Sequence, residues 1–255
     1  MNSNEIELLG VRINTFSPQE VIETVDRFFS TKNKHYIVTP NPEFLVLAHR
    51  DRQFKDILNY ADIAIPDVVG LLYAARLVGK RLRRFTGVDL VWYLCEFAQA
   101  KQLPIFLLGG FQDAAEQAAT TLHRHFPDLI IVGTNDGGVV DDAGLPDRSE
   151  QLIYEINAAK PKIIFVAFGH GKQERWIFKN LDRLTSVQLA VGVGGTFDFL
   201  AGRANRAPEI IQRLGLEWFY RLIAQPWRWR RILNAVIIFP LLIILDTIKK
   251  KIFTR

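Results

Sequence analysis

Short apolar runs alternate with amphipathic stretches along most of this chain, and the alternation limits the folds that the chain can adopt. Six runs are apolar almost without a break, which is typical of strands buried on both faces of a parallel sheet. The sequence therefore predicts an α/β protein with a Rossmann-like, mainly parallel sheet and helices on both faces. The predicted strands are 36–39, 63–65, 105–108, 130–132, 163–167 and 187–193, and the predicted helices are 42–60 (broken near Asp51), 68–78, 88–101, 112–125, 148–159 and 173–184.

The beginning of the chain carries two local signals. Ile6–Leu8 and Val11–Ile13 flank Gly10, which predicts a small hairpin ahead of the main sheet. The segment Ser17–Glu20 has a hydroxyl, a proline and a glutamate at the spacing of a capping box. It therefore predicts a helix that begins at the proline.

The composition changes after Gly202. From Arg203 to the end of the chain, 11 lysines and arginines face three acidic residues, whereas residues 1–202 are slightly acidic. We therefore divide the chain into a Rossmann-like domain, 1–202, and a basic helical appendage, 203–255. A charge asymmetry of this kind indicates a polyanionic partner, such as a diphosphate, an anionic lipid or a nucleic acid.

The appendage contains an apolar run at 232–245, which Pro240 interrupts and Lys249–Lys251 follow. Its 14 residues are short for a membrane span, which needs about 20. Trp227 and Trp229 lie beside arginines just before the run. We therefore expect a helix that lies in the membrane interface. The alternative is a helix that packs its apolar face on the body of the protein or on a second subunit.

Polar side chains follow the first two predicted strands of the sheet. Thr39 and Asn41 each precede a proline, which holds the preceding residue extended. Asp67 follows the next strand, and open α/β sheets bind ligands at the carboxyl ends of their strands. Asp67 is therefore a candidate general base near Thr39 and Asn41. Structural roles compete with this one: Asn41 can cap a helix that begins at Pro42, and for Asp67 capping of the helix that follows is the commoner role.

Two further loops carry groups suited to a phosphorylated sugar. Thr86 is predicted to cap a helix, and Arg84 beside that helix start would clamp a phosphate, with a solvated basic loop as the alternative. Gln173 and Glu174 have the chemistry to recognise sugar hydroxyls or a base edge, and Lys172 to meet a phosphate. His170 lies between two glycines, where an exposed loop residue is the commoner outcome.

The last predicted strand ends in a glycine-rich turn. Gly194 and Gly195 indicate tight packing or a ligand against the main chain, and Thr196 and Asp198 are candidate contacts to hydroxyls or a ribose. The chain contains neither G-x-G-x-x-G nor G-x-x-x-x-G-K-[ST], and no two aspartates are spaced i, i+2. We therefore expect neither a metal site nor another cofactor.

Five motifs occur in the order known from the WecG/TagA/CpsF glycosyltransferases, so the chain resembles that family from about Glu5 to Arg231. The motifs are Thr39–Glu43, Pro66–Gly70, Arg84–Asp89, Lys172–Glu174 with Trp176, and Val193–Asp198. The basic closing stretch resembles the family through Arg206, Pro208, Glu217, Trp218, Arg221 and Pro226. One position departs from the pattern, because Gly171 stands where the family often has a proline before Lys-Gln-Glu.

The resemblance implies an activity. Members of the family transfer an N-acetylmannosaminyl or related sugar from a UDP donor to N-acetylglucosamine on a lipid diphosphate. They work at the cytoplasmic face of bacterial membranes, in the synthesis of surface polysaccharides or teichoic acids, and use no metal. For this chain the resemblance implies a UDP-sugar donor, a polyprenyl-diphosphate-linked acceptor and a peripheral position on the inner face of the plasma membrane.

The resemblance also implies roles for matching residues. Asp67 would be the general base, with Thr39 and Asn41 beside it, and Gln173 would contact the sugars. Arginines would balance the charge on the departing UDP in a single inverting displacement. These arginines are Arg84, Arg221, Arg228 and Arg231, and Arg206 belongs to the same basic stretch.

Two other classes of function remain open at the level of sequence. The fold class permits a dinucleotide-dependent enzyme that modifies nucleotide sugars, although neither glycine pair, Gly109–Gly110 or Gly194–Gly195, has the dinucleotide fingerprint. A non-enzymatic basic protein that binds membranes or nucleic acid would share the basic C-terminus. We expect no nucleic-acid partner, and a homo-oligomer is compatible with an apolar tail that packs on a neighbour.

Overall fold

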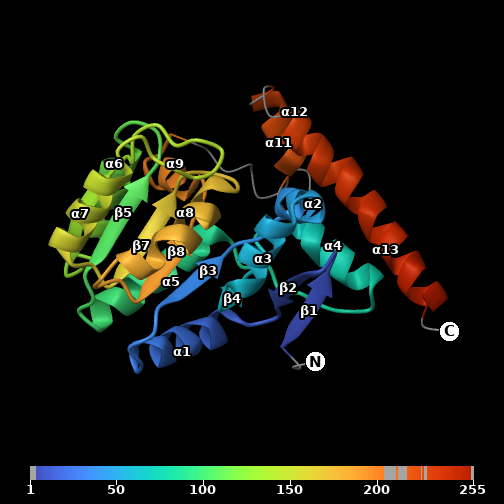
Figure 1. Ribbon diagram of the computed structural model, residues 1–255, viewed down its shortest axis with the longest axis horizontal. Helices are drawn as coiled ribbons and strands as arrows, with labels where there is room; N and C mark the ends of the chain where they lie inside the picture. The colour runs from blue at the N-terminus through green and yellow to red at the C-terminus, as the bar shows by residue number, and fades with distance from the viewer. Residues whose placement is uncertain (1–3, 204–210, 212–216, 225, 227–228, 254–255) are drawn as a thin grey trace.

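The computed structural model describes residues 4–203, 211, 217–224, 226 and 229–253. Six parallel strands form the central sheet in the order β4-β3-β8-β7-β5-β6, which confirms the predicted fold class (Figure 1). The first and last strands of the sheet along the chain, β3 and β8, are neighbours, so loops distant in sequence meet at their carboxyl ends. The strands are β3 (His35–Val38), β4 (Ile63–Ala64), β5 (Ile105–Gly109), β6 (Ile131–Asn135), β7 (Ile163–Ala167) and β8 (Leu189–Gly192).

Helices cover both faces of the sheet because each strand is apolar on both sides. On β7, for example, Ile164 and Val166 join one buried cluster, and Ile163 and Phe165 join the other. Helices α1 (Pro18–Phe29), α5 (Gly87–Ala100), α6 (Ala114–His125) and α9 (Thr196–Leu200) pack on one face. Helices α2 (Pro42–Arg50), α3 (Arg52–Tyr60), α7 (Ser149–Ala159) and α8 (Lys172–Asn180) pack on the other.

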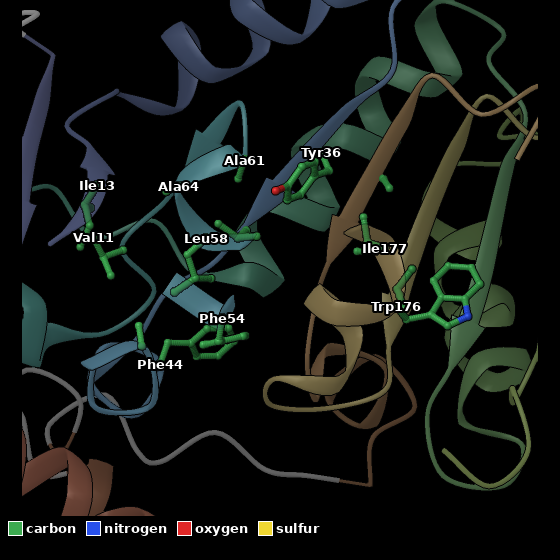
Figure 2. Close-up of a cluster of buried hydrophobic side chains, with 14 of the residues drawn as sticks. Val11, Ile13, Tyr36, Phe44, Phe54, Leu58, Ala61, Ala64, Trp176 and Ile177 are labelled. Carbon is green, nitrogen blue, oxygen red and sulfur yellow. The ribbon is translucent and has the colours of Figure 1, made fainter. Parts of the chain in front are cut away.

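The predicted hairpin is present, and its apolar side chains join the buried cluster that α2, α3, α7 and α8 form with the sheet. Strands β1 (Glu5–Leu8) and β2 (Val11–Asn14) pair antiparallel around Gly10, whose φ of +80° suits a glycine. The Asn14 side chain accepts a hydrogen bond from the Ala64 N–H at 2.7 Å and so ties β2 to the edge strand β4. Figure 2 shows the cluster reaching from Val11 and Ile13 of the hairpin to Trp176 of α8.

The starts of the first two helices have the predicted chemistry. Ser17 and Glu20 form the capping box of α1. Asn41 caps α2, with its side-chain oxygen accepting from the Phe44 N–H at 3.1 Å and Pro42 in the first helical turn. The loop after β3 is therefore short and held by its own cap.

The appendage forms α11 (Glu217–Ala224) and then a helical run of α12 (Trp229–Leu233), the π-helical turn η3 (Asn234–Ile238) and α13 (Phe239–Phe253). The predicted disruption at Pro240 takes the form of this π turn, since proline lacks the N–H for a regular helical bond. Phe239 and Ile243 are buried in the cluster shared with α2. In Figure 1, α13 runs along the side of the molecule that holds α2 and α4 (Val69–Leu77).

The rest of this helical run is apolar and exposed. Within the described residues, Trp229–Lys250 is one helix of 22 residues, long and apolar enough to cross a membrane. The expectation that this segment is too short to span a membrane is therefore wrong. The helix has 22 residues because it extends beyond both ends of the 14-residue apolar run. The alternative of packing on the body holds for one face of the helix. The other face exposes Trp229, Leu233, Ile237, Leu241, Ile244, Leu245 and Ile248.

Candidate active site

A cavity of about 690 Å³ opens at the carboxyl ends of the sheet strands, where open α/β sheets bind ligands. Most of the predicted site residues line it, although they come from six separate segments of the chain. Parallel strands bring these segments together because all of their carboxyl ends lie on one edge of the sheet. The predicted residues in its lining are Thr39, Asn41, Asp67, Arg84, Gln173, Gly194, Gly195, Thr196, Asp198 and Arg231.

Asp67 is held at the cavity by two backbone contacts. Its N–H donates to the Pro40 carbonyl at 3.2 Å, and its Oδ1 accepts from the Gly87 N–H, the first of α5, at 2.9 Å. The prediction that Asp67 caps the helix that follows is wrong. The N-cap residue of α4 is Val68, and no side-chain hydrogen bond caps this helix start among the described residues. The carboxylate instead spans to the helix after that one, which fixes it at the rim of the sheet.

Thr39 and Asn41 are also held by the backbone. The Thr39 hydroxyl donates to the Gly192 carbonyl at 3.2 Å and thus joins the ends of β3 and β8. Asn41 serves as the cap of α2 and lines the cavity at the same time. The capping and site interpretations of Asn41 are therefore compatible.

Gln173 enters the cavity from the first turn of α8. Its side chain is buried, and its Oε1 accepts from the Gly194 N–H at 3.0 Å. Its Nε2 donates to Oε1 of the adjacent Glu174 at 2.7 Å. Burial raises the pKa of Glu174, whereas the hydrogen bonds that it accepts from Gln173 and the Gly171 N–H lower that pKa and favour the ionised carboxylate.

The glycine-rich turn closes the floor of the cavity. Gly194 has a φ of +56°, and Gly195 precedes α9. The Thr196 hydroxyl donates to the Val193 carbonyl at 2.6 Å, so its oxygen is used to shape the turn. Asp198 lines the cavity from the same helix. The turn thus lines the cavity with backbone and one carboxylate, and a contact to a ligand stays a prediction.

Arg231 brings the appendage to the cavity. Its Nε donates to Oε2 of Glu43 on α2 at 2.6 Å, and both side chains are partly exposed. Beside them, the His170 ring packs edge-on against Phe44 with 4.6 Å between ring centroids. Burial lowers the pKa of His170 to about 4, with Glu43 opposing and Arg231 adding to the effect. The expectation of an exposed loop histidine is wrong, because His170 is only partly exposed and its ring packs on Phe44 of α2.

Several predicted arginine positions lie outside the description. Arg206 and Arg228 are outside the described residues, and for Arg221 the structure describes its backbone in α11. Because α11 ends at Ala224 and α12 begins at Trp229, Arg221 and Arg231 lie on different helices. Arg203, which was not among the predicted site residues, also lines the cavity and forms an ion pair with Asp113.

Lys172 is not placed at the cavity. Its Nζ donates to the Val140 carbonyl at 2.7 Å and lies 3.4 Å from Asp142, both on the loop after β6. A residue next to Gln173 on a helix points about 100° away from it, which explains why one enters the cavity and the other does not. The structure thus gives no support to a phosphate contact by Lys172.

A smaller cavity of about 450 Å³ adjoins the main one at the ends of β5 and β6. The two cavities share Gly110, Phe111, Asp136 and Gly138 in their linings. Phe111 is a largely exposed aromatic ring at this shared rim. Among the residues that the structure describes, no group of three or more His, Cys, Asp or Glu side chains could hold a metal ion.

Comparison with known proteins shows the family to which this chain belongs. Residues 6–252 match the model of the "Glycosyl transferase WecG/TagA/CpsF family". The chain belongs to this family. The match confirms the resemblance carried by the five motifs, and it covers the appendage as well as the sheet domain. The main cavity, with Asp67 at one side and Arg231 at the other, is therefore the candidate active site of a WecG/TagA/CpsF glycosyltransferase.

Relatives in the same family carry a more specific name, N-acetylglucosaminyldiphosphoundecaprenol N-acetyl-beta-D-mannosaminyltransferase. The protein from Bacillus subtilis (strain 168) is 35% identical over 216 residues, 81% of this chain and 81% of the relative. The Bacillus spizizenii protein is 33% identical over 233 residues, 91% and 86% of the two chains. The Staphylococcus aureus (strain MRSA252) protein is 30% identical over 243 residues, 93% and 91% of the two chains.

Proposed function

We propose that this glycosyltransferase moves an N-acetylmannosaminyl or closely related sugar from a UDP donor to N-acetylglucosamine on a polyprenyl diphosphate, in cell-wall polymer synthesis. The names of its relatives state this acceptor and this sugar. The observation that carries the proposal is the placement of the Asp67 carboxylate in the same cavity as Thr39 and Gln173. These groups suit a sugar hydroxyl, because a carboxylate can accept its proton while amide and hydroxyl groups orient the ring.

The proposed chemistry is one inverting displacement. An acceptor hydroxyl oxygen attacks the anomeric carbon of the donor and loses its proton to Asp67. The bond from that carbon to the diphosphate oxygen breaks on the opposite face, and UDP leaves. General-base catalysis of this kind contributes about 10²–10⁴-fold to the rate. The hydrogen bond from the Gly87 N–H holds the carboxylate in place for the transfer.

Arginines take the role that a divalent cation has in other transferases. Arg84 and Arg231 line the cavity, and preorganised cations stabilise the charge that develops on a leaving diphosphate. Arg231 would have to share its guanidinium between Glu43 and the diphosphate. Arg206, Arg221 and Arg228 stay predicted contributors to the same charge, and the absence of a metal requirement stays a prediction.

The lipid acceptor implies contact with a membrane, and the appendage supplies a suitable surface. Its exposed stripe of large apolar side chains lies between Arg230 at one end and Lys249 and Lys250 at the other. An apolar stripe with cationic ends favours an anionic bilayer surface, with about 1 kcal/mol from each cation near it. We propose peripheral association with the inner face of the plasma membrane.

The test is direct detection of the product. UDP-N-acetylmannosamine and polyprenyl-diphosphate N-acetylglucosamine are incubated with the full chain, and the disaccharide lipid is sought by mass spectrometry. We expect product with and without EDTA. If product forms only when a divalent metal is added, the proposed metal independence fails but the substrate assignment stands. If no product forms from this donor and acceptor under either condition, the substrate assignment fails.

A further inference from the structure

Glu174 is a buried carboxyl group that the proposed displacement does not use. It lies behind Gln173, is absent from the described lining of the cavity, and is fully buried. Its two oxygens have different partners. Oε2 accepts from the Gly171 N–H at 3.1 Å, and Oε1 accepts from the Gln173 side-chain amide at 2.7 Å.

These contacts form a chain of hydrogen bonds with a fixed polarity. The chain runs from the Gly171 N–H through Glu174 and Gln173 to the Gly194 N–H, which donates to Gln173 Oε1 at 3.0 Å. Both ends are backbone donors. An amide accepts at its oxygen and donates at its nitrogen, so a chain of amides alone would leave two donors facing each other. One member must therefore accept on both sides, and Glu174 is that member.

Gly192 of β8 leaves space for the contact between these two side chains. A Cβ on Gly192 would lie 2.8 Å from Gln173 Nε2 and 2.8 Å from Glu174 Oε1, so a larger residue there would displace one or both side-chain ends. The Gly192 carbonyl also accepts from Thr39, which places this contact directly beside the candidate active site. Gly171 has a φ of +77°, a value that residues with a side chain rarely adopt. This chain thus builds the loop with a glycine and presents its N–H to Glu174.

We propose that Glu174 is a positioning residue that fixes the orientation of the Gln173 amide and, through it, the Gly194 turn. With Nε2 held by Glu174 and Oε1 held by Gly194, the remaining N–H of Gln173 is the group left to meet a sugar oxygen. The inference rests on the proposed role of Gln173 as a sugar contact. It extends that role by naming the group that decides which end of the amide faces the substrate.

The substitution Glu174→Gln tests whether residue 174 must accept hydrogen bonds at both of its side-chain ends, with almost no change in side-chain shape. Its new amide nitrogen must face either the Gly171 N–H or the Gln173 amide, and in either case one buried donor loses its acceptor. We expect hydrogen exchange at the Gly171 or Gly194 amide, or at both, to become at least tenfold faster, measured by NMR on the full chain. Unchanged exchange at both amides would overturn the proposal without any reference to activity.

A double-mutant cycle on sugar transfer separates positioning from general damage. Glu174→Gln should lower kcat/KM about tenfold or more, and it should add almost nothing when Gln173 is already alanine, because the two residues act through one contact. Effects that multiply in the double variant would contradict the proposal. If Gln173→Ala alone leaves kcat/KM unchanged, the proposed sugar contact fails, while the exchange experiment still decides the role of Glu174.

Asn180 offers a matched control on the same helix. It is buried, and its side chain donates to the Trp176 carbonyl at 3.0 Å, away from the cavity. Asn180→Ala should lower the unfolding temperature but leave exchange at Gly194 near the wild-type rate. If Glu174→Gln does not fold, Gly192→Ala is the second variant. Its added methyl group would displace the Gln173 and Glu174 side chains, while the Glu174 carboxyl group itself is retained. Wild-type exchange at Gly194 in that variant would overturn the proposal.

Discussion

The two sides of the candidate active site are held in different ways. On the sheet side, Asp67, Thr39 and Gln173 each bond to a backbone group of another segment, at distances between 2.9 and 3.2 Å. On the appendage side, Arg231 is held by one ion pair with Glu43, and its helix is anchored by the burial of Phe239 and Ile243. The sheet side is preorganised for chemistry, whereas the appendage side uses partly exposed contacts that a ligand can replace.

This difference suits the two tasks of the site. A base must be in place before its substrate arrives, and backbone bonds at the ends of buried strands give that rigidity. A leaving diphosphate needs cations that reach it from above and can exchange partners. An ion pair between partly exposed groups contributes only about 0–1 kcal/mol, so exchanging Glu43 for a phosphate costs little.

The largest effect is expected from breaking the sheet side at Asp67. Asp67→Asn keeps an oxygen that can accept from the Gly87 N–H but cannot take a proton, so we expect kcat/KM for sugar transfer to fall by about 10²–10⁴-fold. The urea midpoint of unfolding should change little, because the backbone contact is retained. Activity within threefold of wild type would remove Asp67 from the role of base.

The two faces of the appendage helix provide the next comparison. Phe239→Ala removes a fully buried ring, and we expect the free energy of unfolding to fall by about 3–5 kcal/mol in urea titrations. Replacing the exposed Ile237, Leu241 and Ile244 by serine should leave that free energy nearly unchanged. It should weaken binding to anionic vesicles by at least about 100-fold, since each loses about 1.5 kcal/mol or more of apolar burial. Vesicle binding that survives the triple change would contradict a membrane role for this face.

A smaller effect should distinguish the partners of Arg231. Arg231→Ala removes a cation from the cavity, so we expect kcat/KM to fall by about 10–100-fold, mainly through kcat. Glu43→Gln keeps that cation and removes only its present partner, and it should change kcat/KM by less than about threefold. Equal losses in the two variants would mean that the ion pair, and not the cation, is what the reaction needs.

The smallest effect concerns His170, which lies where the two sides meet. Burial lowers its pKa to about 4 from an ordinary value of 6.5, so between these values the unfolded chain binds a proton that the folded protein excludes. This residue should therefore lower stability as the pH falls from 6.5 toward 4, by at most about 1.4 kcal/mol per pH unit. The difference in unfolding free energy between wild type and His170→Asn, measured at pH 7 and pH 5, isolates this contribution. A difference independent of pH would show that the ring is not shielded as described.

Much of the site was predictable because it follows from rules that act over a few residues. Asn41 before Pro42 predicted a helix cap, and Thr39 and Asp67 predicted a polar rim, since parallel strands end on one edge. Asp67 was assigned the wrong capping partner, because its true partner, Gly87, is 20 positions away. Lys172 and Gln173 could not be told apart, since the chain shows adjacency but not which direction each side chain takes around α8.

The amino-acid sequence by itself determined the parallel sheet, its order of helices and strands, and the motifs that identify the family. Those properties depend on local periodicity, caps and turns, which act between near neighbours. Only the tertiary structure decided that Arg231 meets Glu43, that the His170 ring packs on Phe44, and that one face of the appendage helix is buried while the other is exposed. These depend on contacts between segments far apart in the sequence, such as Arg231 and Glu43, which are 188 positions apart, and such contacts are chosen by the packing of the whole chain.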